Sequence, residues 1–186
     1  MTRTLITGPT EPITLAQAKL HMRVEHDADG SLITGFITAA RETAEHELGR
    51  PIEAQAWRIS LDAFPPAELH LGPDVTSITS IQYLDAAGDL QTLAAEAYVL
   101  DTGDPTASFV LPADGYEWPA TADAANAVRL QIVCGLTPLP EVVRAWMLLR
   151  IGTLYQHRAE VAAGSSLSPL PGGFADRLLD RYRVYA

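Results

Sequence analysis

Two stretches of the sequence decide the fold: Glu11-Pro-Ile-Thr-Leu-Ala-Gln-Ala-Lys19 and Ala39-Ala-Arg-Glu-Thr-Ala-Glu-His-Glu-Leu-Gly-Arg-Pro51. In the first, Thr14 is followed three residues later by Gln17, the spacing of a capping box in which each side chain bonds the other residue's backbone N–H. In the second, Gly49 is suited to end a helix and Pro51 prevents its continuation. The sequence therefore predicts two well-bounded helices.

The second helix is expected to begin near Asp29 and Ser31, whose side-chain oxygens can accept bonds from the unpaired N–H groups of a first turn. Apolar residues then recur at steps of three and four, which places them on one helix face: Leu32, Ile33, Phe36, Ile37, Ala40, Ala44 and Leu48. The first helix offers Leu15, Ala18, Leu20 and Met22. Since neither helix carries recognisable chemistry, the pair is predicted to pack against other elements.

The composition is that of a globular chain, with 186 residues, 47% hydrophobic and 19% charged. No apolar run reaches the roughly 20 residues of a membrane-spanning helix, and the first residues lack the apolar core of a signal peptide. We therefore expect synthesis in the cytoplasm and no membrane association. Cys134 is the single cysteine and is expected to be a small core residue.

The net charge of −10 is concentrated in the middle of the chain. Residues 54–126 contain eleven acidic residues and one basic residue, Arg58, whereas residues 136–186 contain four acidic residues and six arginines. An acidic region repels the phosphate backbone, so duplex DNA binding through residues 54–126 is disfavoured. Two interpretations stay open: a solvated acidic face that maintains solubility, or a surface that lies near DNA without adhering to it.

The hydrophobic period changes after Pro51. Residues 54–62 alternate apolar and polar side chains, which predicts a half-buried strand. Further strands are expected over 69–71, 75–84 (with an irregularity), 98–100, 109–111 and 127–133. Asp85 to Asp89 is expected to form a hairpin turn, because Gly88 can adopt the positive φ that such turns require.

A helical period returns at residues 142–155, which would form a helix that is apolar on almost every side. Trp146 on this helix is expected to be a core residue. A Gly/Ser/Pro-rich linker over 163–173 precedes a short helix over 174–182, with Phe174, Leu178 and Tyr182 on one side. The predicted class is α+β: a small helical bundle with an inserted antiparallel β unit. The expected divisions are 1–53 (helical pair), 54–135 (β unit), 136–162 (central helix) and 163–186 (linker and C-terminal segment).

The sequence contains no complete catalytic, phosphate-binding or metal-binding motif among those considered. Glu42 and His46 would share a helix face, but Arg50 stands where the second histidine of His-Glu-x-x-His would lie. Phosphate-binding glycine motifs and a Gly-x-Ser-x-Gly motif are missing from the sequence. We therefore expect no enzyme activity, no cofactor and no metal site.

The aromatic and arginine residues indicate interfaces instead. Trp118 lies in a loop before a proline, where local packing and an intermolecular contact are both open. The segment 176–185 combines arginine and tyrosine, which are enriched at binding hot spots, on a flexible tether. Residues expected to pack in the core or against another molecule are Trp118, Trp146, Leu149 and Tyr155.

The order of these pieces resembles phage head–tail connector (adaptor) proteins. The resemblance begins with Pro12-Ile-Thr-Leu-Ala-Gln-Ala-Lys19 and Gly49-Arg-Pro51, and continues through Gln55-Ala-Trp57 and Trp118-Pro119. It then includes Leu154-Tyr-Gln-His-Arg158 and a closing Leu178-Leu-x-x-Tyr-Arg183. Gene transfer agents, which are phage-like particles, contain related adaptors, and the sequence does not separate the two.

The resemblance implies a structural virion component without catalysis. It implies a homo-oligomeric ring, commonly a dodecamer, between a portal protein and a tail-completion (stopper) protein, with DNA passing through its channel. The C-terminal segment would then dock on the portal. Its candidate residues are Leu167, Leu170, Phe174, Arg177, Arg181, Tyr182, Arg183 and Tyr185.

Two other functions stay open. The chain could be an assembly or packaging factor that acts as a soluble interaction module outside the particle. It could also be a hydrolase or metal enzyme, which would require a site that unites Glu42, His46 and a further ligand.

Overall fold

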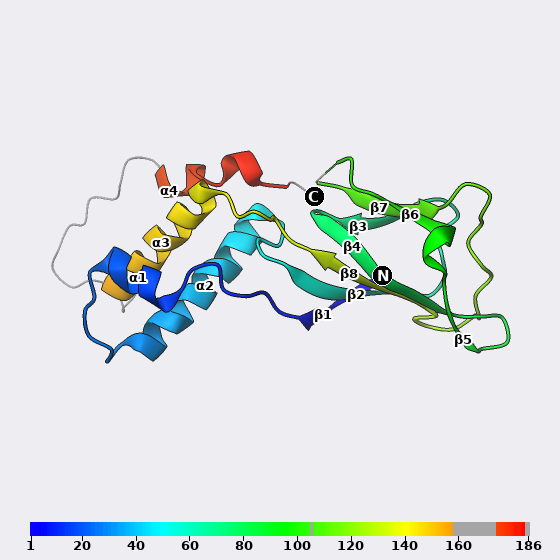
Figure 1. Ribbon diagram of the computed structural model, residues 1–186, viewed down its shortest axis with the longest axis horizontal. Coiled ribbons are helices and arrows are strands. Elements are labelled where there is room, and N and C mark those ends of the chain that lie inside the picture. Colours follow the sequence, from blue (N-terminus) through cyan, green and yellow to red (C-terminus); the bar gives the residue numbers. More distant parts are fainter. Residues whose placement is uncertain (105, 158–173, 185–186) are drawn as a thin grey trace. The chain divides into compact units, whose positions relative to one another are not determined.

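The computed structural model describes residues 1–104, 106–157 and 174–184, and it divides the chain into two compact units (Figure 1). The β unit comprises residues 1–9 and 54–136, and the helical unit comprises residues 10–53 and 137–186. Both units are assembled from separate stretches of sequence. The mixed α+β class is confirmed.

Within the described residues, the β unit contains two antiparallel sheets. The larger has the strand order β1-β2-β8-β4-β5, and the smaller has the order β3-β7-β6. The strands are β1 (Thr2–Thr7), β2 (Gln55–Leu61), β3 (Leu69–Gly72), β4 (Val75–Leu84), β5 (Leu90–Thr92), β6 (Tyr98–Asp101), β7 (Ser108–Pro112) and β8 (Val128–Cys134), with a short 3-10 helix, η1 (Ala95–Ala97), before β6.

Apolar side chains at alternate positions of the strands form the core of the β unit. In β8 every second residue is buried, including Leu130, Ile132 and Cys134, so the cysteine is the small core residue that the sequence predicts. The irregularity expected in β4 consists of two shifts in its register with β8, where an additional residue on one strand interrupts the pairing. The turn from β4 to β5 places Gly88 at φ +88°, as expected.

The helical unit contains α1 (Leu15–Met22), α2 (Gly30–Leu48), α3 (Glu141–Gln156), α4 (Phe174–Arg177) and the 3-10 turn η3 (Asp180–Tyr182). These helices share one apolar core, and α2 and α3 pack against each other (Figure 1). Its largest fully buried side chains are Ile13, Ile33, Leu48, Ile52, Met147, Ile151 and Leu179. Trp146 also lies in this core, with 3% of its surface exposed.

The helix ends agree with the sequence at two of three sites. The capping box is present, since the Thr14 hydroxyl accepts the Gln17 N–H and the Gln17 side chain accepts the Thr14 N–H. Gly49 ends α2 at φ +66°, and a Cβ there would lie 2.6 Å from the Val184 carbonyl oxygen. Asp29 is the N-cap residue of α2, as expected, but the expected side-chain bond is wrong, because its carboxylate makes no capping bond and instead accepts the Tyr155 hydroxyl.

Three further expectations are corrected. Residues 2–7, placed with the helical pair, form β1 in the β unit. Leu32 is partly exposed rather than part of the buried stripe of α2. The terminal helix is divided into α4 and η3, and between them Leu179 is fully buried. The predicted linker, 163–173, lies outside the described residues.

Among the residues described, no helix combines the length and apolar character needed to cross a lipid bilayer.

Candidate assembly surfaces

The outer face of α1 carries an exposed leucine next to a shallow groove. Leu20 is 80% exposed, although the sequence assigned it to the apolar stripe with Ala18 and Met22. Two residues correspond to about 200° around a helix, so Leu20 faces away when Ala18 faces the core. The groove has a volume of about 560 Å³ and is lined by Leu15, Ala16, Lys19, Leu20, Val24 and Asp27.

A salt bridge bounds this groove. The Lys19 ammonium donates a 2.7 Å hydrogen bond to the Asp27 carboxylate, which lowers the pKa of Asp27 below its usual range. The groove therefore combines an apolar floor with a fixed pair of opposite charges at its edge. This arrangement suits a protein partner, since interface cores are apolar and their rims polar.

A buried arginine fixes the chain that leads into α1. Arg41 on α2 forms ion pairs with Glu11 (3.2 Å) and Glu45 (2.7 Å). Thr38 also donates to Glu11, so the segment before α1 is held on α2. The sequence alone did not single out Arg41, although its spacing of four from Glu45 was the available signal.

The suspected metal pair is not assembled into a site. Glu42 is exposed and lies 3.5 Å from Arg41, and His46 is exposed. The described part of the chain holds no group of three potential metal ligands.

The end of the described chain is attached to α2. The Val184 N–H donates to the Leu48 carbonyl (2.8 Å), and Arg50 donates to the Tyr182 carbonyl (3.2 Å). Arg183 forms ion pairs with Glu47 (2.9 Å) and Asp180 (3.2 Å). With Leu179 in the core, residues 178–184 are therefore part of the helical unit rather than a freely tethered arm.

The docking candidates consequently differ in availability. Arg177 and Arg181 are exposed, and the Arg181 guanidinium lies 5.9 Å from the centre of the Tyr182 ring. Tyr182 and Arg183 are half-buried. Leu167, Leu170 and Tyr185 lie outside the described residues, as does the side chain of Phe174.

The ring or core candidates lie in both units. Trp146 is buried, Leu149 is partly exposed on the same helix, and Tyr155 is half-buried at the end of α3. A small cavity of about 70 Å³ lies beside Trp146, Leu149 and Ala175.

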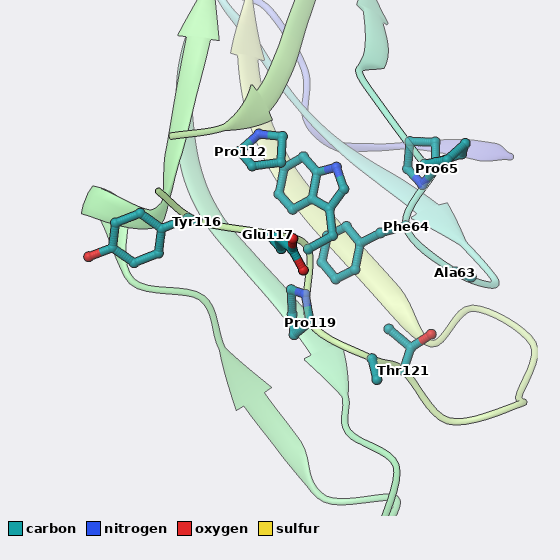
Figure 2. A pocket seen from close by; sticks show the side chains of 11 residues that line it. Ala63, Phe64, Pro65, Pro112, Tyr116, Glu117, Pro119 and Thr121 are labelled. Atoms are coloured by element: carbon teal, nitrogen blue, oxygen red, sulfur yellow. The ribbon is translucent and has the colours of Figure 1, made fainter. Parts of the chain in front are cut away.

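Trp118 packs within the β unit. Its ring stacks on Phe64 with centroids 4.7 Å apart, and its Nε1 donates to the Ala67 carbonyl at 2.8 Å. Figure 2 shows the surrounding pocket, which is also lined by Pro112 and Pro119 and has a volume of about 470 Å³. Local packing thus accounts for the tryptophan, while the pocket stays open to solvent.

Two of the acidic side chains of the β unit, those of Asp85 and Asp104, stabilise turns. Asp85 accepts the N–H groups of Ala87 and Asp89 and the side chain of Gln91, with the Gln91 bond contributing most to a lowered pKa. Asp104 accepts the hydroxyl and the N–H of Thr106, which also lowers its pKa. These carboxylates therefore stay ionised and contribute to a negative surface.

Residues 12–76 match the model of the phage gp6-like head-tail connector family. The resemblance to head–tail connectors is confirmed. The matched range extends from the residues before α1, through α2, β2 and β3, to the start of β4. It therefore contains residues 12–19 and 39–51 and the residues that line the groove of α1.

Solved structures of gene transfer agent (GTA) particles share the fold over the whole chain. A chain in the virion of a native GTA particle has a TM-score of 0.78 at 19% identity. Chains in the neck of an empty GTA particle (C6 symmetry) and of a native one (C12 symmetry) have TM-scores of 0.74 and 0.71 at 21% and 20% identity. In each case 100% of this chain and 97% of the other are covered. No curated protein matches the chain significantly.

Proposed function

We propose that the chain is a structural head–tail connector of a phage or gene transfer agent, and that it forms a ring beneath the portal of the capsid. The observation that carries this proposal is the match of residues 12–76 to the connector family. The fold shared over the full length with chains in GTA necks supports it, since two of those structures have six- or twelvefold symmetry. A rotationally symmetric ring requires two different patches on each subunit, one for each neighbour.

In this proposal the helical unit forms the bundle that builds the ring. Leu20 and the groove of α1 supply an apolar surface on an otherwise well-packed unit. An exposed leucine that lines an apolar groove belongs to a continuous apolar surface, the type that marks protein–protein interaction sites. A neighbouring subunit in the ring is the partner assigned here.

The portal contact is assigned to the C-terminal residues. Arg177 and Arg181 are exposed on a segment that the buried Leu179 holds in place. Because the backbone is already fixed, only the arginine side chains lose conformational freedom on binding, and arginine is enriched at hot spots. The tail-completion protein would bind the opposite end of the ring.

The acidic β unit is assigned to the DNA path. Its carboxylates would repel the phosphate backbone, so DNA would pass without being retained. No residue of this surface is expected to recognise bases, and the connector is expected to act without catalysis or cofactor.

The experiment is to purify particles, identify their proteins by mass spectrometry and image their necks by electron microscopy. The proposal expects this chain in the particles at a constant ratio to the portal protein, with density for a ring below the portal. If the chain occurs in lysates but is missing from particles, the assembly-factor hypothesis replaces it.

A further inference from the structure

The strand β1 buries no side chain in its own subunit. All six residues, Thr2–Thr7, are exposed, and Leu5 and Ile6 each retain 45% of their surface. Leu5 pairs with Trp57, and Ile6 is the unpaired residue at the shift in register, so two neighbouring apolar side chains are exposed at the end of β1. Pairing with β2 and the packing of Arg3 against Trp57 (5.6 Å) hold it in place.

The outer edge of β1 is also unprotected. It is an edge strand of the larger sheet, so half of its backbone N–H and C=O groups have no ladder partner from the described strands. Such edges are usually blocked by lysine, proline or a bulge. Residues 2–7 contain neither lysine nor proline, and the shift in register between Leu5 and Thr7 leaves the pairing of Thr2 to Leu5 regular.

The opposite edge of the same sheet has matching properties. β5 is exposed along its length, with Leu90 at 54%. It follows the exposed Asp89, whereas β1 carries Arg3 and no acidic residue. The two edges therefore offer opposite charges, exposed apolar side chains and unpaired backbone groups.

The directions of the two strands are also compatible with a ring. Each of the four strand pairs in β1-β2-β8-β4-β5 is antiparallel, so β1 and β5 run in the same direction (Figure 1). A rotation that leaves the strand direction unchanged would bring β5 of one copy beside β1 of the next as a parallel pair. This contact is heterologous, which is the type that closes rings.

We propose that β1 of one subunit pairs with β5 of its neighbour, so that backbone hydrogen bonds between β units reinforce the ring. The occupant of the β1 edge is a second copy of this chain, in the manner of β-strand addition. The inference rests on the proposed ring, but it concerns the β unit rather than the α1 groove. Leu5 and Ile6 would lie against Leu90, and Arg3 near Asp89 of the neighbour.

The test is cross-linking of Thr4→Cys/Thr92→Cys chains in assembled particles with a short-spacer bis-maleimide. Both threonines are exposed, and Cys134 is buried. Within one copy β1 and β5 are four strand spacings apart, about 19 Å, beyond the reach of a short spacer. The double variant should therefore give a ladder of covalent multimers on a denaturing gel, and the wild-type chain should give none.

Matched variants separate the possible results. Mixed particles with Thr4→Cys chains and Thr92→Cys chains should give dimers only. The pair Thr4→Cys/Thr102→Cys, with an exposed threonine away from β5, should give no ladder. Dimers from Thr4→Cys alone would mean that β1 pairs with β1, and would overturn the proposal.

Imaging of the same particles separates this inference from the function on which it rests. A neck ring without a ladder from the double variant would overturn the β1–β5 contact and leave the connector function intact. Absence of the wild-type chain from the particles would overturn both.

Discussion

The Tyr155 hydroxyl donates a hydrogen bond of 2.6 Å to the Asp29 carboxylate and so joins the last turn of α3 to the first turn of α2. The contact links residues 126 positions apart. It also explains why the Asp29 side chain makes no capping bond at the start of α2, since its carboxylate is directed to a partner on another helix.

Removing this hydroxyl should weaken the helical unit. We expect Tyr155→Phe to lower the free energy of unfolding by about 1–2 kcal/mol, because a partly buried bond to a carboxylate is lost. Urea unfolding measures the change. Tyr116→Phe makes the same chemical change at an exposed position and should cost almost nothing; equal effects of the two variants would contradict the assignment.

Truncation of Trp146 should be among the most damaging changes in the helical unit. Trp146→Ala should lower the free energy of unfolding by about 3–5 kcal/mol, because a large side chain leaves a cavity in a packed core. Leu149→Ala, on the same helix but 36% exposed, should cost less than about 1.5 kcal/mol. Thermal unfolding followed by circular dichroism would rank the two, and the reverse order would remove Trp146 from the core.

Two substitutions in the C-terminal segment should affect folding and portal docking separately. Leu179→Ala should cost about 2–4 kcal/mol as a core truncation. Arg181→Ala should leave stability within about 0.5 kcal/mol, since surface substitutions are usually mild, but should reduce co-purification with the portal protein. Undiminished portal binding by folded Arg181→Ala would argue against the docking assignment.

The groove of α1 should matter for assembly and not for folding. Leu20→Asp places a charge on an already exposed position, so the isolated chain should keep its melting temperature within a few degrees. The same charge in a neighbour's interface would be desolvated, so neck rings should be lost. Val99→Asp makes a similar change at an exposed β-unit residue and should leave assembly intact. Normal rings with Leu20→Asp would exclude this face from the ring contact.

Glu53 should make stability fall as the pH rises. Burial raises the pKa of Glu53 above its ordinary value of 4.5. The folded state therefore binds more protons than the unfolded state between the two pKa values, and stability is lost as pH rises through that window. Glu53→Gln should then be more stable than wild type at pH 7, with the difference disappearing below pH 4.5. Urea unfolding at several pH values, with Glu96→Gln as an exposed control, measures it; a constant difference would contradict the assignment.

Local features of the fold could be predicted from the sequence. The capping box of Thr14 and Gln17 and the end of α2 at Gly49 depend on neighbours within four residues. The strands with strict alternation, such as β8, follow because each pattern has one buried face. The irregularity of β4 was visible as a break in that alternation.

Features that depend on distant partners could not be predicted. β1 has no buried face, and it becomes a strand only because β2, some fifty residues later, pairs with it. Leu20 resembles a core residue until the orientation of α1 is known, and Arg41 resembles a solvated residue until Glu11 lies beside it. For the assembly surfaces, the residue types could be predicted from the sequence, but their exposure could not. Leu179 is buried and Arg181 is exposed because of how the C-terminal residues pack on the helical core.

The interleaving of the two units has a consequence for synthesis on the ribosome. α1 and α2 are made early, but their partners α3 and Leu179 follow only after the strands β2–β8. At typical elongation rates of about 5–20 residues per second, roughly 7 to 26 seconds pass between the synthesis of the end of α2 and that of Leu179. During that interval an apolar helix face and an unpaired strand edge are accessible to other nascent copies. The core of the helical unit is therefore complete only when synthesis of the chain is almost finished.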